Sequence, residues 1–213
     1  MQLSKPFAGT LLFIATLFLA SGHSLAASSA GKVQRAKGFV MAASPEQGRI
    51  RPLRAGDGIA AGETISTGPN STVQLDFNDG SHVALKPNSR FQIEAFVVRK
   101  EKPEEERSFF SLIKGGLRAV TGLIGKRKPA NYRMKTAVAT IGIRGTDYEL
   151  RLTDQGLYAG VTPGTDSRIV IRNQAGIREL VAGQYAWVKG PDQPIIPLAV
   201  RPPQLGEKPQ ICK

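Results

Sequence analysis

The stretch that decides the fold reads Thr72-Val73-Gln74-Leu75-Asp76-Phe77-Asn78-Asp79-Gly80-Ser81-His82-Val83-Ala84-Leu85-Lys86. Apolar and polar residues alternate on both sides of a central Asn-Asp-Gly. A period of two is typical of a β-strand with one face buried and the other in water. The sequence therefore predicts a β-hairpin over residues 72–86.

The length of the loop sets the register of this hairpin. A loop of two residues would place the apolar side chains of the two strands on opposite faces. A loop of three residues, 78–80, opposes Leu75 with Val83 and gives a single apolar face. The last residue of such a loop needs a left-handed backbone, which glycine adopts without a Cβ clash. We therefore predict the three-residue loop, with Asn78, Asp79 and Gly80 as structural turn residues.

Short β patterns separated by Gly, Pro, Asn and Asp recur over most of the chain. Further structural turns are expected at Gly56-Asp57 and at Gly145. Strands are predicted at residues 37–42, 49–53, 63–66, 91–97, 132–136, 139–143, 148–152, 157–161, 168–171, 177–181 and 185–188. This spacing favours an all-β fold, either a compact sandwich or a solenoid-like roll of short antiparallel strands.

Residues 108–125 fit both a strand and a helix. Every third or fourth residue is apolar, but Gly115-Gly116 would cost a helix about 1 kcal/mol each. We predict a strand to Ile113, a glycine turn, and one short helix at 117–124 that ends at Gly125.

A faint internal similarity links two distant segments. Residues 51–57 read Arg-Pro-Leu-Arg-Ala-Gly-Asp, and residues 178–184 read Arg-Glu-Leu-Val-Ala-Gly-Gln. In each, a predicted strand runs into a glycine turn. The match favours two similar β units, with chance as the alternative for so short a segment.

The two ends of the chain differ from its middle. Residues 1–26 carry Lys5, an apolar run and small residues before Ala26, a pattern typical of a cleavable signal peptide. Residues 27–37 are small and polar and suggest a flexible start. Residues 191–213 hold six of the fourteen prolines and are expected to be an extended tail. Its Cys212 is the only cysteine, so an intermolecular disulfide is the one disulfide open to the chain. These features divide the chain into a leader, a β domain at 38–190 and a tail, and they place the protein in the periplasm.

The charge is strongly positive and unevenly distributed. The formal net charge is +12, and residues 108–146 contain eight Lys or Arg and no Asp or Glu. The stretch 114–135, with Lys126, Arg127 and Lys128 at its centre, is a candidate binding surface. After export the available polyanions are lipid head groups, lipopolysaccharide and acidic protein faces rather than nucleic acid. The alternative is a solvated basic face without a dedicated partner.

Few residues suggest catalysis or a cofactor. His82 is the only histidine after the leader, and it lies within the hairpin as an expected surface strand residue. Residues 76–80 resemble the start of a calcium loop, but the twelfth position is Pro87 where a bidentate Glu belongs. A secreted hydrolase would need paired carboxylates, and no spacing selects a pair among Asp57, Asp76, Asp79 and Asp147. We expect no enzyme, no metal and no cofactor.

A second informative stretch reads Ile141-Gly142-Ile143-Arg144-Gly145-Thr146-Asp147-Tyr148. Arg144 follows an apolar strand, and its guanidinium has five donors. One interpretation is a structural clamp that holds turn carbonyls or a carboxylate such as Asp147 or Asp57. The other is a ligand contact of Arg144 and Asp147 with an anionic partner.

The two stretches together resemble the FecR domain. The earlier pattern is Leu53-x-x-Gly56-Asp57-x-Ile59-x-x-Gly62-Glu63-x-Ile65-x-Thr67-Gly68-x-Asn70-Ser71, continuing into the hairpin. The later one is the Arg-Gly-Thr signature at residues 139–148. Family members commonly show Thr-Pro where this chain has Thr136-Ala137, and Phe where it has Tyr148.

The resemblance implies a periplasmic, all-β sensing module without catalytic residues. In the best-known members it follows a membrane helix and a cytoplasmic helical segment that governs a sigma factor, and it senses an outer-membrane iron transporter. Neither preceding part is recognisable in this sequence. We therefore expect a FecR-like module that binds another envelope protein, in signal transduction. The alternative is a binder of an anionic envelope polymer or membrane surface.

Overall fold

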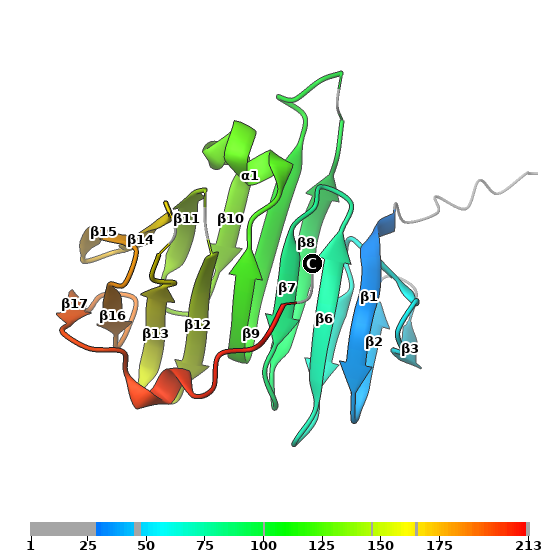
Figure 1. Cartoon of the computed structure of the whole chain (residues 1–213), viewed down its shortest axis with the longest axis horizontal. Helices are drawn as coiled ribbons and strands as arrows, with labels where there is room; N and C mark the ends of the chain where they lie inside the picture. Colours follow the sequence, from blue (N-terminus) through cyan, green and yellow to red (C-terminus); the bar gives the residue numbers. More distant parts are fainter. Residues whose placement is uncertain (1–28, 45–47, 100, 146, 165, 212–213) are drawn as a thin grey trace, which may run out of the picture.

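Two β-sheets that share one long strand make up the fold (Figure 1). The structure is a computed structural model and describes residues 29–44, 48–99, 101–145, 147–164 and 166–211. Sheet A has the order β4 (Gly58–Ala60), β1 (Ser29–Lys37), β6 (Thr72–Phe77), β7 (His82–Leu85), β9 (Arg107–Val120), β12 (Asp147–Thr153), β13 (Gly156–Val161), β16 (Tyr185–Val188), β17 (Ile195–Leu198).

Sheet B has β9 at its centre as well. Its order is β3 (Arg49–Pro52), β2 (Val40–Ser44), β5 (Thr64–Thr67), β8 (Arg90–Val97), β9, β10 (Tyr132–Lys135), β11 (Thr140–Arg144), β14 (Arg168–Asn173), β15 (Gly176–Val181). The all-β prediction is confirmed. Because the two sheets are continuous through β9, all strands belong to one large mixed sheet, which is open and not closed into a barrel. The expectation of purely antiparallel strands was wrong at one place, because β9 and β10 run parallel.

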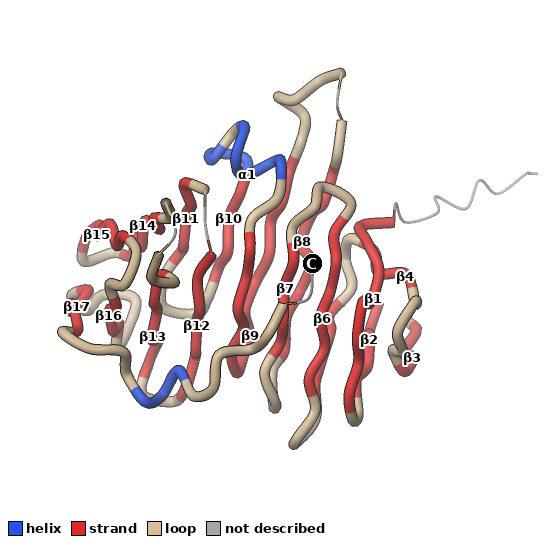
Figure 2. Tube along the Cα trace, in the orientation of Figure 1, coloured by secondary structure: helices blue, strands red, loops and turns tan. Residues whose placement is uncertain are grey.

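Helical segments are short (Figure 2). Among the described residues they are α1 (Leu123–Arg127) and two 3-10 turns, η2 (Pro129–Asn131) and η3 (Pro203–Leu205). Within the described ranges, no helix is long and apolar enough to cross a membrane.

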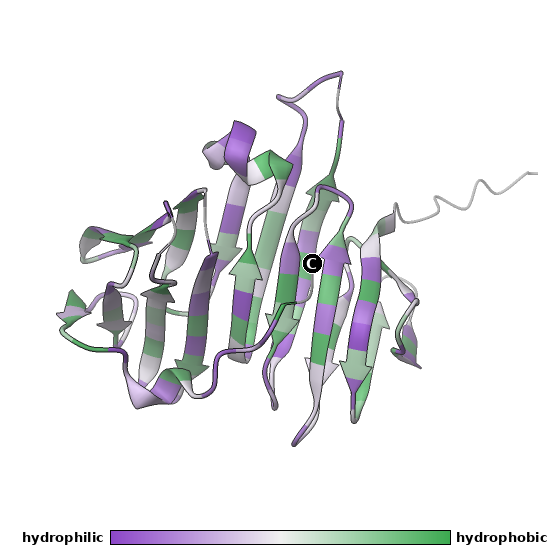
Figure 3. Cartoon of the chain, in the orientation of Figure 1, coloured by the Kyte–Doolittle hydropathy of each residue, from purple (hydrophilic) through white to green (hydrophobic). Residues whose placement is uncertain are grey.

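The core is formed by the buried side chains of both sheets. Hydrophobic and hydrophilic residues alternate along many strands (Figure 3). The centre of the core is an aromatic cluster in which neighbouring ring centroids lie 5.1 to 6.4 Å apart, made by Phe77, Phe91, Phe96, Phe110 and Tyr132. Aliphatic side chains from both sheets extend this cluster along the length of the molecule. Burial of these apolar faces is the main force that holds the sheets together.

The predicted hairpin is confirmed in loop length and register. Leu75 opposes Val83 and Val73 opposes Leu85, and all four side chains are buried. Gly80 has φ +77° at the end of the loop. His82 is a half-buried strand residue whose Nδ1 lies 2.8 Å from an oxygen of Asp76 on the water-facing side.

The helix predicted at 117–124 was wrong. Strand β9 runs through both glycines to Val120, and α1 begins only at Leu123. Gly115 has φ +84°, and a Cβ there would lie 2.4 Å from Ser89 Oγ. It is the bend at which β9 passes from sheet B to sheet A. The bend shifts the inward-facing residues from the even positions Phe110 and Leu112 to the odd positions Leu117 and Ala119. The apparent helical stripe therefore mixed outward residues such as Ile113 with buried ones such as Leu117.

The expectations for the chain ends were also wrong where the structure describes them. Residues 29–37 form strand β1, paired with β4 and β6, instead of a flexible start. Residues 195–198 form β17, paired with β16 on the edge of sheet A, instead of belonging to an extended tail. The predicted signal peptide at 1–26 and Cys212 lie outside the described residues.

The internal similarity marks two equivalent units at opposite ends of the sheets. At one end, Val33 N donates to Asp57 O and Val33 O accepts from Gly56 N, both at 2.8 Å. At the other end, the same two bonds join Val161 to residues 184 and 183, both at 3.0 Å. In each unit the side-chain oxygen of the turn residue, Asp57 or Gln184, accepts a bond from the backbone three residues earlier. The units are β1–β4 and β13–β16, each running sheet A, B, B, A.

Candidate interaction surface

The Arg-Gly-Thr stretch joins the two sheets. It leaves β11 in sheet B at Arg144, turns at Gly145, and enters β12 in sheet A at Asp147. Gly145 has φ +57°, a backbone conformation that favours glycine and agrees with its expected turn role. Thr146 lies outside the described residues. The stretch therefore presents residues on both outer surfaces of the molecule.

The clamp on Asp147 is made by Arg118 and not by Arg144. Arg118 Nε and Nη2 donate to the two oxygens of Asp147 at 2.9 and 2.7 Å. This hydrogen bond raises the pKa of Arg118. Burial alone would raise the pKa of Asp147, but the bonds and charge of Arg118 hold it below its usual range. Arg144 is exposed, and the part of the clamp interpretation that paired it with Asp147 is wrong, because Arg118 holds that carboxylate.

The unusual tyrosine in the signature has a polar partner. Tyr148 is fully buried, and its hydroxyl lies 2.6 Å from that of Tyr132. A buried tyrosine hydroxyl needs a hydrogen bond, and Tyr132 provides it. Thr136, in the loop before the signature, donates to Ala139 O and accepts bonds from two backbone amides. The contact with Tyr132 explains why a tyrosine fits at position 148, and the Thr136 bonds hold the loop that contains Ala137.

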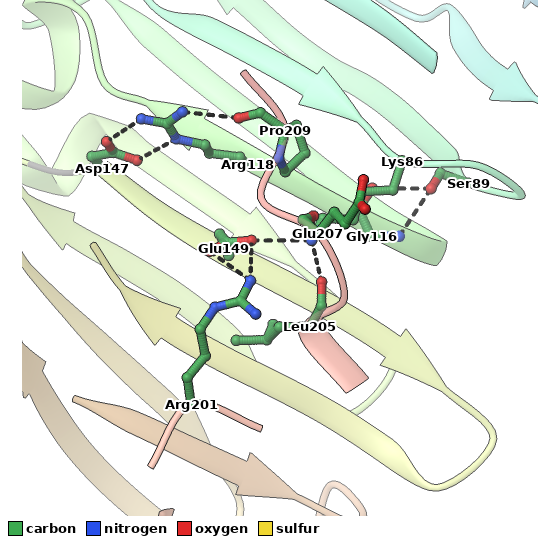
Figure 4. A network of polar contacts seen from close by, with 10 residues as sticks. All are labelled: Lys86, Ser89, Gly116, Arg118, Asp147, Glu149, Arg201, Leu205, Glu207 and Pro209. Carbon is green, nitrogen blue, oxygen red and sulfur yellow. Dashed lines mark hydrogen bonds and ion pairs between the residues drawn. The ribbon is translucent and has the colours of Figure 1, made fainter. Parts of the chain in front are cut away.

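The C-terminal segment is bound across the outer surface of sheet A (Figures 1 and 4). We call residues 199–211 the strap. Lys86 Nζ donates to Leu205 O and, at 2.9 Å, to Glu207 O. Arg118 Nη1 donates to Pro209 O at 2.9 Å. The bound carbonyls belong to alternate residues, as expected for an extended chain lying on the sheet.

A buried ion pair underlies the strap. Lys86 Nζ lies 3.0 Å from Glu149 Oε2, and their side chains are 7% and 6% exposed. Arg201 of the strap also contacts Glu149, at 3.1 Å (Figure 4). Burial lowers the pKa of Lys86, and Glu149 opposes that effect. The charged groups at the centre of this surface are therefore engaged within the chain.

The outer surface of sheet B is different in charge. Five cations project from three adjacent strands, and we call this surface the basic face: Arg133 and Lys135 on β10, Arg144 on β11, Arg168 and Arg172 on β14. Glu94 on β8 lies 3.3 Å from Arg133, and Glu179 on β15 lies 3.1 Å from Arg168. The acidic residues thus stand at the two margins of a surface that is positive in its middle.

Two features of the basic face are unfavourable for a pair of strands. Arg144 stands directly opposite Arg168 in the β11–β14 ladder, and like charges in that relation are destabilising. Gly142 lies two residues before Arg144 on the same face of β11 and opposes Val170 of β14. A Cβ at Gly142 would meet only Val170 O, at 3.9 Å, so the fold has room for a side chain there. Glycine in a strand often marks close approach of another backbone.

The cluster Lys126, Arg127 and Lys128 lies at one end of this face. All three residues are exposed at the end of α1, and a Cβ at Gly125 would meet the Ile143 side chain of β11. The basic stretch 114–135 is not one surface, however. Arg118 lies on sheet A beneath the strap, whereas Arg133 and Lys135 lie on sheet B.

The carboxylates considered for hydrolysis are each engaged in a different structural contact. Asp57 accepts from Arg54 N in the turn after Gly56, where φ is +93°. Asp79 accepts from the backbone and hydroxyl of Ser81, and its carbonyl accepts from Leu123 N. The neighbouring Asn78 amide donates to Ser29 O. The turn at 78–80 thus anchors β1 and α1.

Sequence reasoning missed the residues that hold the strap. Arg118 and Glu149 occupy outward positions on strands, and Lys86 directly follows β7. Charged residues are ordinary at such positions. The alternation of their strands carried no sign that a distant segment covers them.

Comparison with known proteins gives two results. Residues 63–167 match the family model described as FecR protein. The chain contains a FecR domain. A search of curated proteins gave no match.

Two crystal structures of a candidate anti-sigma factor from Parabacteroides distasonis are similar to this chain. Identities to the FecR-domain chain are 12% and 13%, and TM-scores are 0.49 and 0.50. In each case the alignment covers 64% of this chain and 59% of the other. The chain thus spans about three fifths of those proteins, and the likeness concerns fold alone. The FecR family is one of regulatory, signal-transducing proteins rather than of enzymes.

Proposed function

We propose that this FecR-domain protein is a non-enzymatic periplasmic module that binds another envelope protein and relays a signal through it. The basic face is the contact surface, and the partner presents an acidic surface. The periplasmic location rests on the leader-like residues 1–26.

The observation that carries the proposal is the contrast between the two sheets. On sheet A, the central charges form internal ion pairs and the chain's own strap covers them. On sheet B, Arg144 and Arg172 are exposed, and Gly142 leaves the backbone of β11 accessible. Complementary charge accelerates association and sets orientation. An acidic partner would also relieve the repulsion between Arg144 and Arg168.

The position of the contact surface on the molecule is tested by photocrosslinking in intact cells. A photoreactive residue at Val170, on the basic face, is expected to give a discrete protein adduct that mass spectrometry identifies. The same group at Ile50, 74% exposed on the distant strand β3, is the control. Equal adducts from both positions, or none from Val170, would contradict the proposal.

Two variants test the chemistry. Arg144→Glu with Arg172→Glu should abolish the Val170 adduct, whereas Arg49→Glu on the edge strand should leave it. Gly142→Val should leave the melting temperature unchanged or raise it, because valine favours strands and the site is open. It should nevertheless block the adduct. A Gly142→Val protein that is stable and still crosslinks fully would show that the partner does not approach β11.

A second function is favoured by the end of α1. Leu123 is 47% exposed beside the cationic residues 126–128. An apolar residue next to three cations suits an anionic membrane or lipopolysaccharide surface. Cosedimentation with phosphatidylglycerol vesicles that is lost in Lys126→Glu, and at high salt, would support this alternative. Binding that is unaffected by that variant would refute it.

A further inference from the structure

A separate hollow lies on the outer surface of sheet A, near the edge formed by β17. It has a volume of about 600 Å³ and is bordered by the turn before β13, the end of β16 and the start of the strap. Small-molecule sites have volumes of about 300–1,000 Å³ and combine an apolar wall with a few polar groups. This hollow has both.

The wall is aromatic and fixed in orientation. Tyr158 and Trp187 are cross-strand neighbours whose rings stack at 24° with centroids 6.3 Å apart. Trp187 Nε1 donates to Gln155 O at 2.9 Å, and the Tyr158 hydroxyl donates to Gln155 Oε1 at 3.3 Å. Leu198 and Pro202 complete the apolar lining. The polar tips of both rings are bound, so their apolar surfaces line the hollow.

The rim is polar but carries no net charge. Gln155 and Gln204 contribute amides, while Asp154 and Lys189 contribute opposite charges. All four residues are exposed. Amide and carboxylate groups supply both donors and acceptors, which suits hydroxyl groups. A phosphate or another polyanion would instead prefer the basic face on the other sheet.

The strap is required for this geometry. Pro202 and Gln204 reach the hollow only because Arg201 contacts Glu149 and because Lys86 binds the carbonyls that follow. Leu205 is fully buried beside Gly160. A Cβ at Gly160 would lie 3.2 Å from the Leu205 side chain, so the glycine leaves room for it. The anchored strap thus converts an aromatic strand pair into a walled site.

We propose that this hollow binds an uncharged pyranose unit of an oligosaccharide. One face of a pyranose ring presents polarised C–H groups, which pack on the negative faces of aromatic rings. Its hydroxyl groups, at the ring edge, meet the amides and the carboxylate of the rim. This activity is independent of the basic face and of the partner proposed for it.

The single tryptophan provides the measurement, because Trp187 is the only one in the chain. The full-length protein is titrated with chitotetraose and with maltotetraose, and Trp187 emission is followed. N-acetylphenylalanine amide represents an aromatic side chain of a protein partner. We expect a saturable change with at least one tetrasaccharide and none with the amide.

Exposed rim variants locate the binding without risk to the fold. Asp154→Ala and Gln204→Ala should each weaken binding about fivefold, the effect of one lost hydrogen bond. Gln174→Ala, an exposed glutamine on another turn, should not. No saturable response, a response to the aromatic amide alone, or sugar binding that neither rim variant changes would each overturn the proposal.

Discussion

The ion pair beneath the strap gives the most direct test of the structure. Lys86→Met keeps an unbranched apolar stem of similar length but removes the ammonium that binds Glu149 and two strap carbonyls. Breaking a buried pair by removing one partner costs about 3–5 kcal/mol. Glu149 retains Arg201, whose side chain is 35% exposed and so compensates only partly. We therefore expect a loss of about 2–4 kcal/mol in the free energy of unfolding.

The assay is urea unfolding at pH 7, together with hydrogen exchange of the strap amides. In thermal unfolding, a loss of this size lowers Tm by roughly 4–16 °C in a chain of this length. The strap amides should exchange faster, whereas those of the central strand β9 should change only through the global loss. The matched control is Arg99→Met, because Arg99 and Glu105 are 58% and 43% exposed and their pair contributes about 1 kcal/mol or less.

A double-mutant cycle separates the pair from the packing. Lys86→Met with Glu149→Gln should cost less than the sum of the single changes, by about 1 kcal/mol or more, because the second change removes the uncompensated charge. A Lys86→Met protein within about 0.5 kcal/mol of the parent, or strict additivity in the cycle, would refute the buried arrangement of Lys86 and the strap.

The other predictions concern the turn and two sets of titrating groups. Gly80→Val should cost about 1–2 kcal/mol or more, since φ is +77°, whereas Gly80→Asn should cost much less, and equal melting temperatures for the two would refute the loop assignment. The folded-state pKa of Asp147 is depressed, so its stabilisation is complete above its unfolded pKa of about 4 and is lost as the pH falls through the folded pKa. Asp147→Asn should therefore flatten the acid limb of the stability curve below about pH 4, and an unchanged limb in chemical denaturation would contradict this. Burial raises the pKa of both Tyr132 and Tyr148, so each favours the folded state until alkaline pH passes the unfolded value of about 10, above which stability falls. Tyr132→Phe should leave the native absorbance titration at 295 nm unchanged up to about pH 11, and loss of a titrating group there would count against the buried hydroxyl pair.

Local sequence was sufficient where a strand met a turn. The hairpin register followed from alternation and from one glycine, and the turn at Gly56 and its distant counterpart at Gly183 were visible as a short repeat. These features depend on residues close together in the chain. The hairpin register and these turns therefore do not depend on distant parts of the chain.

Local sequence failed where a distant segment changed the meaning of a pattern. Gly115 was interpreted as the end of a strand, but its contact with Ser89 makes it a bend within β9. One interpretation of the sequence offered Asp147 as a partner of its neighbour Arg144, but Asp147 pairs with Arg118, which is adjacent only across the sheet.

The amino-acid sequence by itself determined the fold class, the strand alternation and the family, because each depends on spacings of a few residues. Only the tertiary structure decided which charges are exposed. Arg118 and Arg133 belong to one basic stretch, yet the bend in β9 and the parallel placement of β10 put them on opposite sheets. One was then covered by the strap and the other remained on the open basic face, because the distribution of charge over a sheet depends on pairing between strands and not on order along the chain.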